Sequence, residues 1–299
     1  MLFRSVSPEA PVPVVDVTGF DQRLGGAGNV ALNIKAMGAT PILCSVIGQD
    51  KEGKDLRDIM MKSGLTCNGL IHSDKRKTTN KTRVLGNNHQ LLRIDHEITH
   101  DLDVVDSFLL EQRFSEELEN CDVVIFEDYN KGVLHGKNIE LLIQKCVTKG
   151  IPTIVDPKKA NFLAYKNVTL FKPNLKEIKE GLKIETDLSD VAHLNDAIAQ
   201  LMLSLNNEYT LVTLSERGVV ITGKNETHHI PAHIRTIADV SGAGDTVVSV
   251  AALCLSAKTD AKTLAELSNL AGGLVCEITG VVPINKEQLL AEAIKILGK

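Results

Sequence analysis

Short apolar runs alternate with helical stripes along most of the chain, and this alternation predicts the architecture. Apolar residues recur at helical spacing over 26–37, at positions 27, 30, 31, 34 and 37. Short apolar runs typical of strands lie at 41–47, 122–126, 151–155, 169–171, 210–214 and 219–222. Further helices are expected at 51–62, 104–118, 139–148, 175–182, 191–205, 243–255, 264–279 and 286–297. This order predicts an α/β fold in which helices cover both faces of a mainly parallel sheet, with ligands beyond the carboxyl ends of its strands.

Two segments in the first hundred residues do not follow the alternation. Residues 11–17 contain prolines, which favour an edge strand. Residues 82–85 and 90–94 flank Gly86-Asn87-Asn88, which predicts a β-hairpin. We therefore expect segments near 11–17 and 80–95 to form a small second sheet that acts as a lid over the ligand site.

The segment 239–246 has the sequence DVSGAGDT and precedes a long apolar run. The run predicts a buried helix, so Gly242, Ala243 and Gly244 lie at its amino end, where unpaired N–H groups and the helix dipole favour an anion. Asp245, on the first turn, could accept a proton from an alcohol while the amides hold developing negative charge. This arrangement suits phosphoryl transfer to a hydroxyl; the alternative is a glycine-rich loop capped by an aspartate.

Polar clusters follow several of the predicted strands. They lie at 127–132, 156–158, 174–177 and 213–218. Any one of them could be a turn or a helix cap, and Asn174 with Glu177 forms a plausible N-cap pair. Their joint placement at one sheet edge, together with Asp245, instead favours a binding site.

Two further features leave alternatives open. Gly25-Gly26-Ala27-Gly28-Asn29 is either a tight turn for helix packing or a turn in which backbone groups and the Asn29 amide hold a polyhydroxylated ligand. It matches neither a dinucleotide-binding G-x-G-x-x-G motif nor a Walker A loop. Arg83, Gln90 and Arg93 lie in or beside the hairpin, either as solvated edge charges or as ligands of a substrate phosphate.

Composition narrows the class of partner. The 299 residues are 43% hydrophobic, enough for a sizeable core, and carry a net charge of −5 without a long basic run, so we expect no nucleic-acid partner. Six scattered cysteines indicate small buried residues in a reducing compartment. No segment approaches the ~20 apolar residues of a membrane span, and prolines interrupt the N-terminus where a signal peptide would be apolar. We expect a cytoplasmic protein with no membrane partner.

The two glycine turns resemble the signatures of the PfkB, or ribokinase-like, sugar kinases. Residues 25–31, with Gly48-Gln49-Asp50, are similar to the N-terminal signature, and residues 239–246 are similar to the more specific C-terminal one. Asn174-x-x-Glu177 is similar to a third family motif. Within the family, the chain resembles the branch that phosphorylates D-glycero-β-D-manno-heptose 7-phosphate in lipopolysaccharide core synthesis, through segments 7–14, 82–84, 90–95, 128–132 and 156–158.

The resemblance implies a ribokinase-like three-layer α/β/α fold with a β lid, ATP and Mg²⁺ as cofactors, and a role for each motif residue. Asp245 would deprotonate the anomeric hydroxyl, and the amides of Gly242, Ala243 and Gly244 would hold the transferring phosphoryl group. The nucleotide would lie near Asn174, Leu175, Lys176, Glu177, Thr213, Ser215, Gly218 and Asn269, with Glu177 serving Mg²⁺. The sugar would face Gly26, Asn29, Asp128 and Lys158, and the 7-phosphate or the lid would involve Arg83, Gln90 and Arg93.

The resemblance has two departures. Family members usually begin with a strand and a Gly-Asp-x-x-x-Asp-like segment before the Ser7–Pro11 motif, so we expect the first central strand to be missing. Many relatives in this branch also carry a nucleotidyltransferase domain, which we do not expect in a single kinase domain that ends at Lys299. The alternatives are a kinase for another sugar or sugar phosphate, and a non-catalytic homologue. Apolar Leu85, Leu91 and Leu92 on the lid suggest a homodimer.

Overall fold

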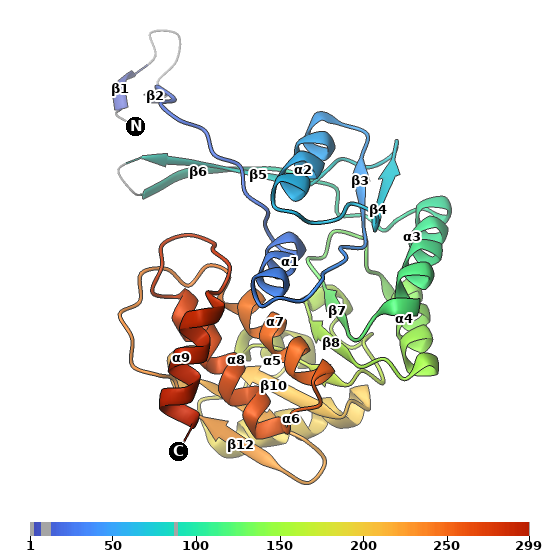
Figure 1. Cartoon of the computed structure of the whole chain (residues 1–299), viewed down its shortest axis with the longest axis vertical. Coiled ribbons are helices and arrows are strands. Elements are labelled where there is room, and N and C mark those ends of the chain that lie inside the picture. The colour runs from blue at the N-terminus through green and yellow to red at the C-terminus, as the bar shows by residue number, and fades with distance from the viewer. Residues whose placement is uncertain (1–2, 7–12, 87–88, 299) are drawn as a thin grey trace.

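A six-stranded sheet, in the order β12-β11-β10-β9-β8-β7, forms the centre of the molecule (Figure 1). The structure is a computed structural model that describes residues 3–6, 13–86 and 89–298. Strands β7 to β10 run parallel, and β11 and β12 are antiparallel to their neighbours. The strands are β7 Val124–Glu127, β8 Thr153–Asp156, β9 Leu170–Phe171, β10 Tyr209–Thr213, β11 Val219–Thr222 and β12 Thr227–Ile230.

Helices cover both faces of this sheet, which confirms the predicted three-layer α/β/α architecture. Successive strand residues point to opposite faces. Thus Ile154 and Leu170 join the core beneath α1, α7, α8 and α9, whereas Val155 and Phe171 join the core beneath α3, α4, α5 and α6. The helices are α1 Ala27–Ala36, α2 Lys51–Lys62, α3 Val104–Glu117, α4 Gly136–Lys149, α5 Leu175–Leu182, α6 Val191–Leu205, α7 Ala243–Ser256, α8 Ala261–Val275 and α9 Lys286–Leu297.

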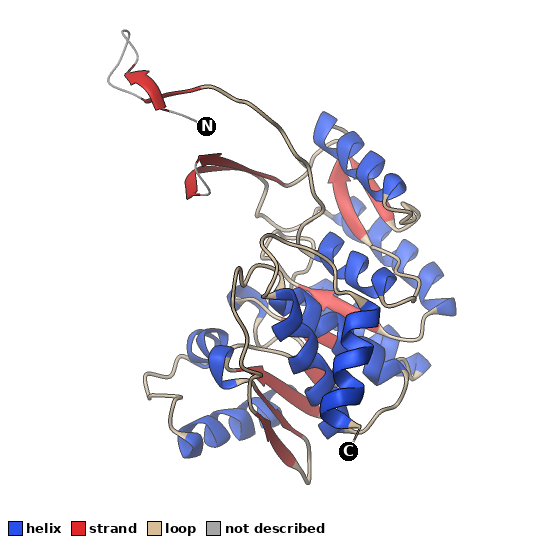
Figure 2. Cartoon of the chain, turned by 60° about the vertical axis from the view of Figure 1, so that its left-hand side comes forward, coloured by secondary structure: helices blue, strands red, loops and turns tan. Residues whose placement is uncertain are grey.

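Three two-stranded sheets lie outside the central one. β3 Ser45–Gly48 and β4 Leu70–Ser73 pair in parallel beside α2. β5 Asn80–Gly86 and β6 His89–His96 form the predicted hairpin, whose turn residues Asn87 and Asn88 lie outside the described residues. β1 Phe3–Val6 pairs with β2 Pro13–Val15, and both this pair and the hairpin project from the body on the same side (Figures 1 and 2). The expected single lid sheet from 11–17 and 80–95 is therefore wrong in its pairing: among the described residues, β2 pairs with β1 and the hairpin strands pair with each other.

The structure differs from the sequence prediction mainly in the short strands. The strand expected at 41–47 begins only at Ser45, and β4 and β12 were not predicted. Both of these strands are four residues long and carry a histidine, so they lack a clear apolar run; pairing with a neighbouring strand supplies the stability that the local sequence does not. Among the described residues, no helix is long and apolar enough to cross a membrane, and the cysteines are free.

Candidate active site

The amino end of α7 is the centre of the candidate site. Gly242 caps the helix at φ 83°, a conformation that favours glycine, and a Cβ atom there would lie 3.1 Å from Asn29 Nδ2. The N–H of Ala243 donates to Val240 O at 3.3 Å, so it is partly engaged within the turn. Gly244 is exposed and Asp245 lies on the first turn, which places an approachable helix amino end beside a carboxylate.

Two side chains hold the carboxylate of Asp245. Asn29 Nδ2, from α1, donates to Asp245 Oδ2 at 2.8 Å, and the Tyr129 hydroxyl donates to Asp245 Oδ1 at 3.2 Å. The Tyr129 ring lies against Gly26, where an added Cβ would approach it to 3.1 Å. Burial raises the pKa of Asp245, and these two hydrogen bonds partly offset that rise. The result is an oriented carboxylate with increased basicity, as a general base requires.

Two more carboxylates lie beside this base. Glu127, Asp156 and Asp245 each place an oxygen within 4.8 Å of the others. Burial raises the pKa of Glu127 well above its usual value, and the charges of Asp156 and Asp245 raise it further. The ammonium of Lys172, a buried side chain, lies 3.2 Å from Asp156 Oδ1 and offsets part of this negative charge. Glu127 Oε1 is buried without a hydrogen-bond partner, and clustered carboxylate oxygens are the ligands that Mg²⁺ prefers.

Lys158 connects this acidic cluster to the start of α5. Its ammonium lies 2.6 Å from Glu177 Oε1 and 3.8 Å from Asp156 Oδ1. Burial disfavours the charged form of Lys158, but the carboxylates of Asp156 and Glu177 outweigh that cost and raise its pKa. Asn174 and Glu177 form the predicted capping box, in which each side chain accepts the backbone N–H of the other at 2.9 Å.

The other residues predicted to face a nucleotide lie around β10 and α8. Thr213 forms an isolated parallel bridge with Asn174, which places the two segments side by side. Gly218 permits a close backbone approach, because a Cβ there would lie 2.0 Å from Ile230 O. The Asn269 amide donates to Pro231 O at 2.8 Å. Ser215 is exposed, the Lys176 side chain is exposed beside Glu180, and Leu175 packs against the core beneath α5.

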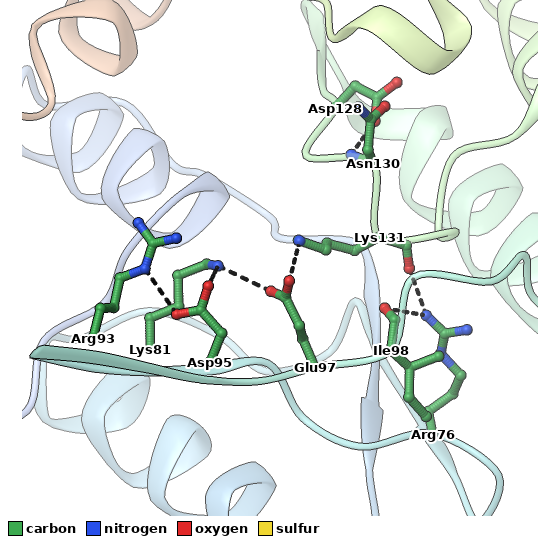
Figure 3. Close-up of polar contacts among 9 residues, drawn as sticks. All are labelled: Arg76, Lys81, Arg93, Asp95, Glu97, Ile98, Asp128, Asn130 and Lys131. Carbon is green, nitrogen blue, oxygen red and sulfur yellow. Dashed lines mark hydrogen bonds and ion pairs between the residues drawn. The ribbon is translucent and has the colours of Figure 1, made fainter.

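The residues predicted to face the sugar fall into two environments. Asp128 is buried, and its carboxylate accepts from the backbone N–H of Asn130 (Figure 3). It also accepts from Tyr165 and Asn161, so it stabilises the loop after β7. Arg83 and Arg93 are exposed register partners on β5 and β6, and Gln90 is exposed near the hairpin turn. These lid residues do not contact Asp128 in the described structure.

Tyr129 and Lys172 were not assigned roles from sequence. Tyr129 lies within a polar cluster that the sequence placed at the sheet edge, but only the folded loop brings its hydroxyl to Asp245. Lys172 directly follows β9, and a lysine after an apolar strand is a signal that could have identified it. Its burial becomes interpretable only when Asp156 is seen beside it.

Comparison with known proteins identifies the family. The model for the pfkB family carbohydrate kinases matches residues 3–288. The chain belongs to the pfkB family of carbohydrate kinases. It is therefore a phosphotransferase that acts on a sugar, as its glycine turns and the carboxylate at α7 indicated.

Individual relatives agree with this assignment. The bifunctional protein HldE of Campylobacter curvus is 38% identical over 281 residues, which cover 94% of this chain and 59% of the relative. This chain thus spans about three fifths of that relative's length. Phosphofructokinase-2 from Escherichia coli in complex with potassium has a TM-score of 0.78 at 19% identity, over 99% of this chain and 94% of that one. Ribokinase of Arabidopsis thaliana, complexed with ribose and ATP, has a TM-score of 0.74 at 15% identity, over 93% and 91%. These two structures establish the ribokinase-like fold.

Proposed function

We propose that this chain is an ATP-dependent kinase that phosphorylates the anomeric 1-hydroxyl of D-glycero-β-D-manno-heptose 7-phosphate. The product is the 1,7-bisphosphate, an intermediate on the route to ADP-heptose and the lipopolysaccharide core. The observation that carries the kinase chemistry is Asp245 at the amino end of α7, held by Asn29 and Tyr129. The choice of sugar rests on the segments that resemble the heptose kinase branch and on the 38% identity to the Campylobacter curvus relative.

The reaction follows from this geometry. Asp245 accepts the proton of the 1-hydroxyl as the sugar oxygen forms its bond to the γ-phosphorus, while the bond from that phosphorus to the ADP oxygen breaks. The helix amino end at Gly242, Ala243 and Gly244 stabilises negative charge on the transferring group. The hydrogen bonds from Asn29 and Tyr129 hold the Asp245 carboxylate in one orientation, which lowers the entropic cost of reaching the transition state.

The nucleotide lies on the side of α5 and β10 in this proposal. Asn174, Glu177 and Thr213 border it, with Gly218 and Asn269 shaping the adjoining backbone. Mg²⁺ supplied with ATP would neutralise phosphate charge, and Glu177, with the neighbouring carboxylate of Asp156, would hold it. Lys158 lies between these carboxylates, so it keeps them positioned and can attract the phosphates.

The lid has two roles in this proposal. Its inner face carries Arg83 and Arg93 toward the 7-phosphate, with Gln90 near the tip. Its other face exposes Leu92 and Ile94, by 55% and 53%, and would pair with a second copy of the chain. Light scattering tests this: Leu92→Lys should convert a dimer to a monomer, whereas Leu203→Lys, at an exposed position on α6, should not. A wild-type monomer would exclude the dimer.

A single experiment tests the catalytic proposal. ADP release is measured with Mg-ATP and the heptose 7-phosphate, the unphosphorylated heptose or fructose 6-phosphate, and ³¹P NMR identifies the product. We expect turnover with the heptose 7-phosphate and a loss of about 10²- to 10⁴-fold in kcat in Asp245→Asn. Turnover with fructose 6-phosphate alone would favour the kinase for another sugar phosphate. Binding of a sugar phosphate without ADP release from the folded chain would favour the non-catalytic homologue.

A further inference from the structure

Alternating charges run along the inner face of the lid hairpin and end on the loop after β7 (Figure 3). This charge ladder consists of Arg93, Asp95, Lys81, Glu97 and Lys131. Arg93 Nε lies 3.0 Å from Asp95 Oδ1, and Lys81 Nζ lies 3.1 Å from Asp95 Oδ2 and 2.9 Å from Glu97 Oε2. Lys131 completes the ladder through a short ion pair with Glu97 Oε1.

The charges of this region do not balance. Arg83 lies directly opposite Arg93 in the hairpin register, and like charges at such a position destabilise a strand pair. With Arg83 included, four cations face two carboxylates, which leaves an excess of two positive charges. A phosphate monoester carries up to two negative charges at neutral pH, so it complements this excess. A neutral sugar does not.

Lys131 is the most firmly placed cation of the group. Arg76, a buried side chain, donates to Lys131 O at 2.5 Å and to His100 O at 2.7 Å, which ties the loop after β7 to the loop that follows β6. The Lys131 side chain is 24% exposed, compared with 51% for Arg93, so solvent screens its charge less. Tyr129, two residues earlier on the same loop, contacts the base Asp245. The loop therefore spans the distance from the reacting end of the site to the lid.

We propose that Lys131 binds the phosphate of the acceptor at its end of the charge ladder, and that Glu97 occupies Lys131 until the phosphate displaces it. The proposal rests on the proposed function in that the acceptor is a sugar phosphate. A phosphate dianion offers Lys131 more negative charge than the single carboxylate of Glu97, so the exchange is favourable for a phosphorylated sugar. An unphosphorylated sugar has no group to replace Glu97. Glu97 is therefore a specificity-determining residue that disfavours neutral sugars.

Three variants of the Lys131–Glu97 ion pair separate phosphate binding from a purely structural role. Isothermal titration calorimetry without ATP measures the binding of D-glycero-β-D-manno-heptose 7-phosphate and of inorganic phosphate. Lys131→Met should weaken binding about tenfold or more, Lys131→Arg should retain most of it, and Glu97→Gln should tighten it several-fold, because the competing carboxylate is lost. The pair Lys145–Glu111, at 3.1 Å between α4 and α3, supplies matched controls: Lys145→Met and Glu111→Gln should leave binding unchanged.

Lys131→Met and Glu97→Gln should change the binding affinity in opposite directions, and this difference decides between the two roles. A purely structural ion pair predicts that Glu97→Gln and Lys131→Met weaken binding alike, and that result, or no change in either, would overturn the proposal. Tighter binding in Glu97→Gln cannot come from poor folding, so this variant decides even if Lys131→Met is unstable. Suppose that the two variants change the affinity for inorganic phosphate in these opposite directions but the heptose 7-phosphate is not phosphorylated. The phosphate site is then correct and the proposed acceptor is wrong. If the heptose 7-phosphate is phosphorylated but the two variants do not change the affinity in opposite directions, the proposed function is correct and only the phosphate site at Lys131 is wrong.

Discussion

The side-chain amide of Asn29 donates a hydrogen bond of 2.8 Å to the carboxylate of Asp245, and 216 positions separate the two residues. Each belongs to one of the two glycine-containing signatures of the chain. Packing of α1 against α7 brings them together, and Asn29 is almost completely buried in that contact. The first signature therefore orients the base that the second one carries.

This relationship predicts the effect of removing the amide. Asn29→Leu keeps the volume but removes the donor, so kcat should fall about tenfold or more. Asn33→Leu, one turn later on α1, is the matched control. Asn33 Oδ1 accepts from Ile284 N at 2.9 Å, so this variant should instead lower the free energy of unfolding by about 1–3 kcal/mol. Equal kcat values for Asn29→Leu and wild type would contradict an orienting role for Asn29.

The Tyr129 hydroxyl should set the acidic limb of the pH–rate profile. The base must be ionised, so kcat/KM falls as the pH drops through the pKa of Asp245, which burial raises and the Tyr129 hydrogen bond lowers. Tyr129→Phe removes the lowering contribution, and the acidic limb should move to higher pH. Burial raises the pKa of Tyr129 itself, so the hydroxyl remains a donor over the assayed range. A limb that stays in place or moves to lower pH would argue against Asp245 as the titrating group.

Alanine substitutions at Gly244 and Gly242 should have different effects: the first should lower activity, and the second should lower the free energy of unfolding. At Gly244 the nearest atoms to an added Cβ are Lys172 Nζ at 3.9 Å and Asp156 Oδ2 at 4.0 Å, so alanine fits without strain but occupies space beside the acidic cluster. Gly244→Ala should preserve or increase stability, by up to about 1 kcal/mol, because alanine favours helix. Its kcat/KM for ATP should nevertheless fall about 100-fold, since the methyl group obstructs the phosphoryl position.

Gly242→Ala should behave differently. At φ 83° a Cβ is strained, and it would crowd Asn29, so the free energy of unfolding should fall by about 1–3 kcal/mol. Urea denaturation and steady-state kinetics on both variants make the comparison. Wild-type turnover by Gly244→Ala would remove the helix amino end from the proposed phosphoryl site.

The two residues of the α5 capping box allow the role of the Glu177 charge to be tested separately from the stability of the helix. Glu177→Gln retains an oxygen that can accept the Asn174 N–H, so the cap should persist while the carboxylate charge is lost. The Mg²⁺ concentration for half-maximal rate should rise about tenfold or more. Asn174→Ala should instead lower the free energy of unfolding by about 1 kcal/mol. An unchanged Mg²⁺ dependence in Glu177→Gln would mean that other carboxylates, such as Asp156, hold the ion.

Local signals in the sequence were sufficient for most helices. The bounds of α2, α5, α6 and α9 coincide with the predicted segments, and a capping side chain (Asp50, Asn174, Asp190 or Asn285) precedes each of them. The prediction of 264–279 was wrong for α8, which begins at Ala261, after its cap, and ends at Val275. The alternation of predicted strands and helices along the chain indicated helices on both faces of the sheet, and the structure confirms this. The short strands β4 and β12 were missed because their pairing, rather than their composition, stabilises them.

The sequence by itself determined the fold class, the carboxylate at the start of α7 and the family, since each depends on residues close together in the chain. Only the tertiary structure brought Glu127, Asp156 and Asp245 within 4.8 Å of one another and buried Lys172 beside them. It alone also placed Asp128 in a structural hydrogen-bond network and joined Lys131 to Glu97 of the lid. These contacts depend on how separate strands and loops meet, and on burial, which sets the strength of each charge interaction; neither is encoded in local spacing.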